Sequence, residues 1–136
     1  MTSRPSLRFA AIGLNHSHIY GQTVALLDAG AELVAVHAEE DDLAAAYIQR
    51  FPQARRVADR REILDDTRIP MVVSATIPDT RAATAIEVMR HGKDVMVDKP
   101  GVITQGELAE VRRVQAETGR IFSVCFSERF ENRATE

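Results

Sequence analysis

The sequence predicts an α/β protein with a doubly wound parallel sheet of about six strands. Short apolar segments rich in valine, isoleucine and alanine alternate with longer segments of helical periodicity along nearly the whole chain. The spacing between successive apolar segments fits one helical crossover each, which is the connection that parallel strands require. At 136 residues, the chain is long enough for a single hydrophobic core.

The first half of the chain is expected to contain three strands and three helices. Apolar runs predict strands at 7–12, at 31–37 and, as a short segment, near Val57. Apolar residues at helical spacing predict helices at 18–28, 41–52 and 60–64. Acidic residues favour a helix start at Asp41, and Asp59 can cap the short helix that follows it.

The second half repeats the alternation. Strands are expected at 71–76, 95–97 and 121–126, and helices at 79–91 and 104–118. Gly92 suits a helix end that requires positive φ. Thr104 and Glu107 have the spacing of a capping box, and Gly119 marks the end of that helix.

Composition excludes several classes of partner. The net charge is −3 without any basic block, so neither nucleic acid nor an anionic membrane surface is an expected partner. No apolar run is long enough to span a bilayer, and the first residues lack the apolar core of a signal peptide, which gives a cytoplasmic location as the expectation. The one cysteine, Cys125, lies in an apolar run, and we expect a buried strand residue there.

The turn after the first strand is the expected place for a phosphate group. A full fingerprint would read G-x-G-x-x-G, whereas this turn keeps Gly13 and has Asn15 and His18 at the second and third glycine positions. The turn therefore has two interpretations. It is either a phosphate-binding turn at a helix N-terminus or a tight strand-to-helix turn that needs Gly13 for its backbone alone.

A carboxylate at the end of the second strand would bind the ribose hydroxyls of a dinucleotide. Ala38 occupies the expected position and Glu39 follows it, so Glu39 either reaches the ribose or is a solvated residue. The segment is acidic and we expect no Arg or Lys near it, which argues against a bound 2′-phosphate. NAD is therefore expected as cofactor in preference to NADP.

Lys99 follows the buried strand 95–97 and precedes Pro100, which cannot continue a sheet ladder. Ligands of open α/β sheets bind at this carboxyl edge. A lysine there can donate to a substrate oxygen and stabilise negative charge that develops on it. The alternative is a surface lysine after a strand.

Two other features allow alternative interpretations. The histidines on either side of Ser17, His16 and His18, suggest a metal, but no acidic or cysteine residue has suitable spacing, so no metal is expected. Arg81 could face the same crevice as Lys99, or it could be a solvated residue of its helix.

The order of these features resembles the Gfo/Idh/MocA oxidoreductases, which include glucose–fructose oxidoreductase and inositol dehydrogenase. The resemblance rests on Gly13, Ser74 to Asp79, Gly92-Lys93 and Asp98-Lys99-Pro100, and the ending Phe126 to Phe130 also resembles the family's crossover from the first domain. It implies a Rossmann-like domain that binds a nicotinamide cofactor, with a sugar, polyol or related small molecule as substrate. Asp98 stands where the family usually has Glu, and Arg81 stands where it commonly has His.

The resemblance also implies roles for particular residues. It places Lys99 as the catalytic residue beside nicotinamide and substrate, and the loop with Thr76 and Pro78 against the cofactor. The complete set of expected cofactor-binding residues is Gly13, Leu14, Asn15, His16, Glu39, Ala75, Thr76, Ile77, Pro78, Asp98 and Lys99.

Residues 1–126 are expected to form the dinucleotide-binding domain, and residues 127–136 to begin the crossover to a second domain that the chain does not contain. In the family, that second domain supplies substrate contacts and usually the oligomer interface. We therefore expect a truncated chain that is inactive alone, with a homo-oligomer possible for the whole protein. The alternative function is a nucleotide-free binding or regulatory relative with the same fold.

Overall fold

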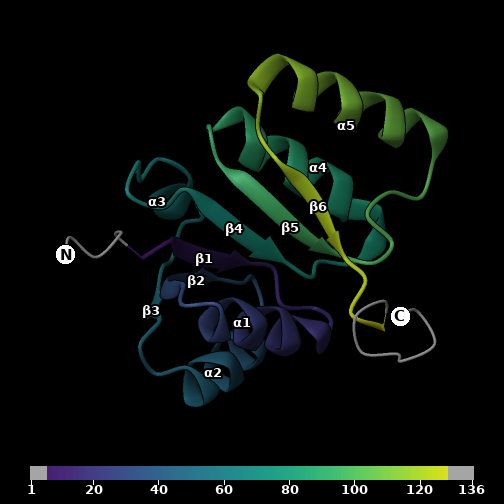
Figure 1. Cartoon of the computed structure of the whole chain (residues 1–136). Helices are drawn as coiled ribbons and strands as arrows, with labels where there is room; N and C mark the ends of the chain where they lie inside the picture. The colour runs from purple at the N-terminus through teal and green to yellow at the C-terminus, as the bar shows by residue number, and fades with distance from the viewer. Residues whose placement is uncertain (1–5, 129–136) are drawn as a thin grey trace.

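The computed structural model describes residues 6–128 and contains one six-stranded parallel sheet with the strand order β3-β2-β1-β4-β5-β6 (Figure 1). All five pairings between neighbouring strands are parallel. This confirms the expected fold class. The strands are β1 (Arg8–Ile12), β2 (Glu32–His37), β3 (Arg55–Arg56), β4 (Met71–Ser74), β5 (Asp94–Asp98) and β6 (Phe122–Cys125).

Helices cover both faces of the sheet. They are α1 (His18–Asp28), α2 (Asp41–Arg50), α3 (Arg61–Leu64), α4 (Pro78–Arg90) and α5 (Gln105–Thr118). α1 and α2 lie on one face, and α4 and α5 lie on the other (Figure 1). None of the helices in the described part of the chain is long and apolar enough to cross a bilayer. Most of the expected crossover at 127–136 lies outside the described residues.

Alternation along β1 divides the core into two layers. Phe9 and Ala11 pack in the cluster beneath α1 and α2, whereas Ala10 and Ile12 pack in the cluster beneath α4 and α5. All four side chains are almost completely buried, as expected for a parallel strand covered on both faces. β1 is therefore packed on both faces, which holds in place the point where the next loop begins.

The predicted helix ends are confirmed at α5. Thr104 Oγ1 accepts a hydrogen bond from the Glu107 N–H at 3.0 Å, and the Glu107 carboxylate accepts one from the Thr104 N–H, which completes the capping box. Gly119 ends the helix with φ of 67°. The expectation of a buried Cys125 is wrong, because β6 is an edge strand and leaves this residue half-buried.

Strand order places the loops of interest together. β1 lies between β2 and β4, so the crossovers that follow β1 and β4 leave in opposite directions along the sheet. Such a switch point is where open α/β sheets bind their ligands. We use the term carboxyl edge for the loop residues 13–17, 38–40, 75–78 and 98–101 that follow β1, β2, β4 and β5.

Gly13 links the loop after β1 to the ends of the two neighbouring strands, β2 and β4. Its N–H donates to His37 O at 3.0 Å, and its own carbonyl accepts from the Ala75 N–H at 3.1 Å. It has φ of 83°, and a Cβ at this position would stand 2.1 Å from Thr76 Cγ2. The turn therefore requires glycine for two independent reasons, the backbone conformation and the lack of space.

We expect Gly13→Ala to lower the free energy of unfolding by about 2–4 kcal/mol, since a left-handed alanine costs about 1–2 kcal/mol and a steric overlap adds to it. Gly30→Ala is the matched control, because Gly30 has φ of 89° but nothing within 4 Å of the added Cβ. Gly30→Ala should lower the free energy of unfolding only by the cost of a left-handed alanine, without the steric contribution. Urea denaturation measures both, and equal losses would contradict the steric argument.

Candidate functional site

Asp98 is the centre of the carboxyl edge. It ends β5, and its side chain is 2% exposed. Oδ1 accepts a hydrogen bond from the Lys99 backbone N–H at 2.8 Å and lies 2.9 Å from His18 Nδ1. Oδ2 lies 3.5 Å from His16 Nδ1 and 3.7 Å from Arg81 Nη2. A buried carboxylate needs such partners, and this one has them on both oxygens.

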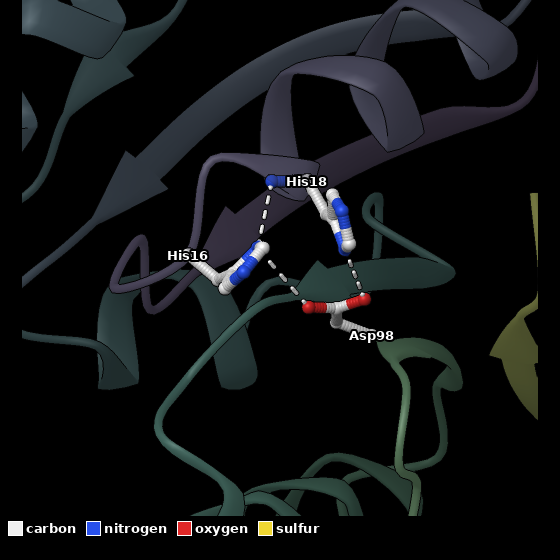
Figure 2. A group of neighbouring side chains, drawn as sticks. All are labelled: His16, His18 and Asp98. Atoms are coloured by element: carbon white, nitrogen blue, oxygen red, sulfur yellow. Dashed lines mark hydrogen bonds and ion pairs between the residues drawn. The ribbon is translucent and has the colours of Figure 1, made fainter.

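The two histidines converge on Asp98 from the loop after β1 (Figure 2). His18 begins α1, and its backbone N–H donates to His16 Nδ1 at 3.1 Å. The two imidazole rings lie 4.1 Å apart, and both side chains are about half exposed. The expectation that no acidic residue joins these histidines is wrong, because the fold brings Asp98 to them from 80 residues away.

Arg81 connects the loop after β4 to the loop after β5. It is 1% exposed and lies in the first turns of α4. Nε and Nη2 donate to Thr76 O at 3.1 and 2.6 Å, and Nη1 donates to Pro100 O at 2.9 Å. Burial lowers the pKa of its guanidinium, and the Asp98 carboxylate partly offsets that effect. The structure therefore excludes the solvated interpretation of Arg81.

The turn after β1 fits an anionic group. The backbone N–H groups of Leu14, Asn15 and Ser17 have no acceptor among the described residues. The hydroxyls of Ser74 and Thr76 are buried and also lack partners in the described part of the chain. Unpaired donors at the start of a helix are the arrangement that binds phosphate groups. The Leu14 side chain packs into the core, so only the backbone of Leu14 faces a ligand.

A surface hollow of about 490 Å³ lies at the end of β2 and is lined by His37, Ala38, Glu39, Asp41, Arg56, Val57 and Ala58. Glu39 is therefore exposed at a hollow on the carboxyl edge. Arg56 forms an ion pair with Asp41 on the same wall. The expectation that no basic residue lies near Glu39 is wrong, because β3 pairs with β2 and brings Arg56 to the hollow.

The remaining expected residues also lie on the carboxyl edge. Ala75 is fully buried and offers only its backbone, which bonds to Gly13 and His16. Ile77 is 48% exposed beside Pro78, the first residue of α4. Lys99 is exposed, and its backbone is held by Asp98. Every residue of the expected site therefore lies on one edge of the sheet.

Lys93 has a different role, although it belongs to the segments that carry the resemblance. It lies before β5, at the opposite edge of the sheet, and is 2% exposed. Nζ donates to Asp66 O at 2.6 Å and to Ile69 O at 2.7 Å, and burial lowers the pKa of its ammonium. This lysine therefore fixes the connection between α3 and β4.

The sheet order, the glycine turn and the loops of the carboxyl edge together place this chain in the class of dinucleotide-binding Rossmann domains. Residues 7–126 match the model of the Gfo/Idh/MocA oxidoreductase family, in its NAD-binding Rossmann fold. The chain therefore belongs to the Gfo/Idh/MocA oxidoreductase family.

Each of three relatives matches most of this chain but well under half of its own length. Inositol 2-dehydrogenase 2 of Saccharopolyspora erythraea is 30% identical over 84% of this chain and 33% of its own length. A candidate oxidoreductase from Erwinia carotovora atroseptica is 39% identical with a TM-score of 0.91, over 96% of this chain and 39% of its own. WlbA dehydrogenase of Chromobacterium violaceum, solved with NADH and UDP-GlcNAcA, is 22% identical with a TM-score of 0.83 over 94% and 37%.

The cofactors named with solved neighbours include both nicotinamide dinucleotides. WlbA was solved with NADH, and biliverdin reductase of Synechocystis, 21% identical with a TM-score of 0.78 over 91% of this chain and 39% of its own, was solved with NADP⁺. The chain spans about a third of the length of the curated relatives that it matches, between 29% and 35%.

Proposed function

We propose that these residues form the NAD-binding part of an oxidoreductase that acts on a sugar, a polyol or a related small molecule. The observation that carries the proposal is the convergence of the Gly13 turn, the Thr76 loop and Lys99 on the carboxyl edge. The similarity to inositol 2-dehydrogenases supports the substrate class.

Particular groups would hold the cofactor. Backbone N–H groups of the Gly13 turn would bind the pyrophosphate, and Glu39 would bind the ribose hydroxyls. The Thr76 hydroxyl, buried and without a partner among the described residues, would donate to or accept from the nucleotide. When bound, a nicotinamide accepts or donates a hydride at the substrate carbon.

Lys99 would act on the substrate oxygen. Its ammonium can donate a hydrogen bond to a hydroxyl or carbonyl oxygen and stabilise the alkoxide that develops there. Asp98 accepts from the Lys99 backbone N–H, which fixes where the lysine side chain begins. Lys99 is thus the proposed catalytic residue.

A preference for NAD over NADP is the finer part of the proposal. Glu39 and Asp41 line the hollow at β2 and would repel a 2′-phosphate, and Arg56 is already paired with Asp41. We expect NAD to bind more tightly than NADP and Glu39→Ala to weaken NAD binding about tenfold, the loss typical of one hydrogen bond to a charged group. Asp42→Ala, in the same acidic stretch but outside that lining, should leave it unchanged.

Calorimetric titration of the chain with NAD and NADP tests this preference. Tighter binding of NADP, or the same affinity for NAD in the Glu39→Ala variant, would contradict the role of Glu39.

A nucleotide-free relative is the second candidate, and one contact favours it. The Asn15 side chain donates to Glu40 Oε1 at 2.7 Å, which connects the turn after β1 with the turn after β2. A dinucleotide would pass between these turns. Asn15→Gly removes the contact and restores the second glycine of the fingerprint. Absence of NAD and NADP binding by both this variant and the unmodified chain in the same titration would support the nucleotide-free function over the first proposal.

A further inference from the structure

We propose that His16, His18 and Asp98 form a site for a divalent first-row metal ion of the zinc class. Each residue offers one ligand atom, and these atoms all lie within 4.8 Å of one another (Figure 2). The site is distinct from the proposed nucleotide contacts of the Gly13 turn, which use backbone N–H groups. It shares His16 and Asp98 with the set of residues expected to contact the cofactor, so metal binding is tested without nucleotide.

The distances suit a small cation. His18 Nδ1 lies 2.9 Å from Asp98 Oδ1, and His16 Nδ1 lies 3.5 Å from Oδ2. Zinc–ligand bonds of about 2.0–2.1 Å in a tetrahedral shell separate neighbouring ligand atoms by roughly 3.3 Å. The two observed separations lie on either side of that value and run to different oxygens of Asp98, and one ligand atom from each residue can be chosen so that all three lie within 4.8 Å of one another. His16 Nδ1 accepts a hydrogen bond from the His18 backbone N–H at 3.1 Å, so a metal ion would have to displace that bond as the half-exposed His16 ring rotates.

The donor set selects the class of ion. Two imidazoles and one carboxylate match zinc sites with an open position and also the two-histidine, one-carboxylate sites of iron(II). Calcium and magnesium prefer oxygen ligands and more of them. With three protein ligands, the remaining position would hold water or a ligand oxygen.

The carboxylate is held in place by its neighbours. The Lys99 backbone N–H donates to Asp98 Oδ1, and Arg81 Nη2 lies 3.7 Å from Oδ2. Hydrogen bonds of this kind orient a ligating carboxylate. The positive charge of Arg81 opposes a cation at this site, and the shorter contacts of its guanidinium are the hydrogen bonds to the carbonyls of Thr76 and Pro100.

A cavity gives access to the site. It measures about 640 Å³, and its lining includes His18, Asp98 and Gln22. Gln22 is 2% exposed, and its Oε1 has no partner in the described part of the chain. This oxygen is thus an acceptor left unpaired by the described residues, on a residue that lines the same cavity as His18 and Asp98.

Titration of the tag-free 136-residue chain with Zn²⁺, without nucleotide, tests the site by calorimetry. Co²⁺ is the spectroscopic probe, because its visible absorption reports its coordination. We expect one Zn²⁺ per chain. His16→Ala and His18→Ala should each weaken binding at least roughly 10- to 100-fold, the loss known for outer-shell partners alone. His91→Ala, an imidazole beside Asp65 away from the site, is the matched control and should bind as the unmodified chain does.

The variants at positions 16 and 18 alter exposed side chains, so they should fold, and thermal unfolding without metal checks this. Asp98→Asn is a third variant, and if it fails to fold, the histidine variants decide alone. Zinc affinity that survives either histidine substitution, or a dissociation constant weaker than about 1 mM for the unmodified chain, would overturn the proposal. The cluster would then be a hydrogen-bond network only.

Discussion

Replacing Arg81 with methionine is expected to lower the free energy of unfolding by about 3–5 kcal/mol, the loss typical when one partner of a buried ion pair is removed. Methionine keeps much of the side-chain length but no donor. Thr76 O would lose two hydrogen bonds and Pro100 O one, and the buried Asp98 carboxylate would lose its nearest guanidinium. Urea denaturation measures the change.

Arg90→Met is the matched control on the same helix. Arg90 is exposed, and its guanidinium lies 3.6 Å from the Glu110 carboxylate, a surface pair that contributes at most about 1 kcal/mol. The double variant Arg81→Met/Asp98→Asn should be less destabilised than Arg81→Met alone, since no uncompensated charge remains. Similar losses for Arg81→Met and Arg90→Met would show that Arg81 does not support the carboxyl edge.

Lys99→Met is expected to reduce turnover by about two to four orders of magnitude in an oxidoreductase that contains these residues, the range for loss of a positioned acid–base or electrostatic group. Methionine is also an unbranched side chain but carries no charge. The missing interaction is stronger in the transition state than in the ground state, so the rate falls more than substrate binding. NAD affinity should change little, because its proposed contacts lie on the Gly13 turn and the Thr76 loop.

Turnover and NAD affinity of this variant are measured together. Arg112→Met, which removes an exposed cation from α5, should leave both unchanged. Lys99→Arg keeps the charge with a different shape and should retain part of the activity. If Lys99→Met turns over within a few-fold of the unmodified enzyme, Lys99 is a surface residue.

The fold could be predicted because its signals are local. Helical and strand periodicity gave the order of the elements, and their bounds agree with the structure to within a few residues. The third strand shows the limit of predicting element bounds from local periodicity. Its ladder pairs are formed at Arg55–Arg56, while Val57 lies just beyond them, with its N–H bonded to Val36 O and its side chain in the core.

The candidate site could be predicted only in part, because its contacts are not local. Periodicity placed His18 and Asp98 each at an element end but could not show that they lie 2.9 Å apart. Arg81 looked like an ordinary polar residue of an amphipathic helix, and its burial depends on carbonyls of two distant loops. Arg56 reaches the hollow at β2 because strands pair, which no local pattern reveals.

The sequence separation of 80 positions from His18 to Asp98 also has a kinetic consequence. Contacts so distant along the chain require a large loop to close, and such closure is slow compared with helix formation. During synthesis, β1 and α1 leave the ribosome long before β5 can join the sheet. We therefore expect the carboxyl edge to be completed in the last stage of folding. In refolding experiments, ligand binding should appear later than helical circular dichroism.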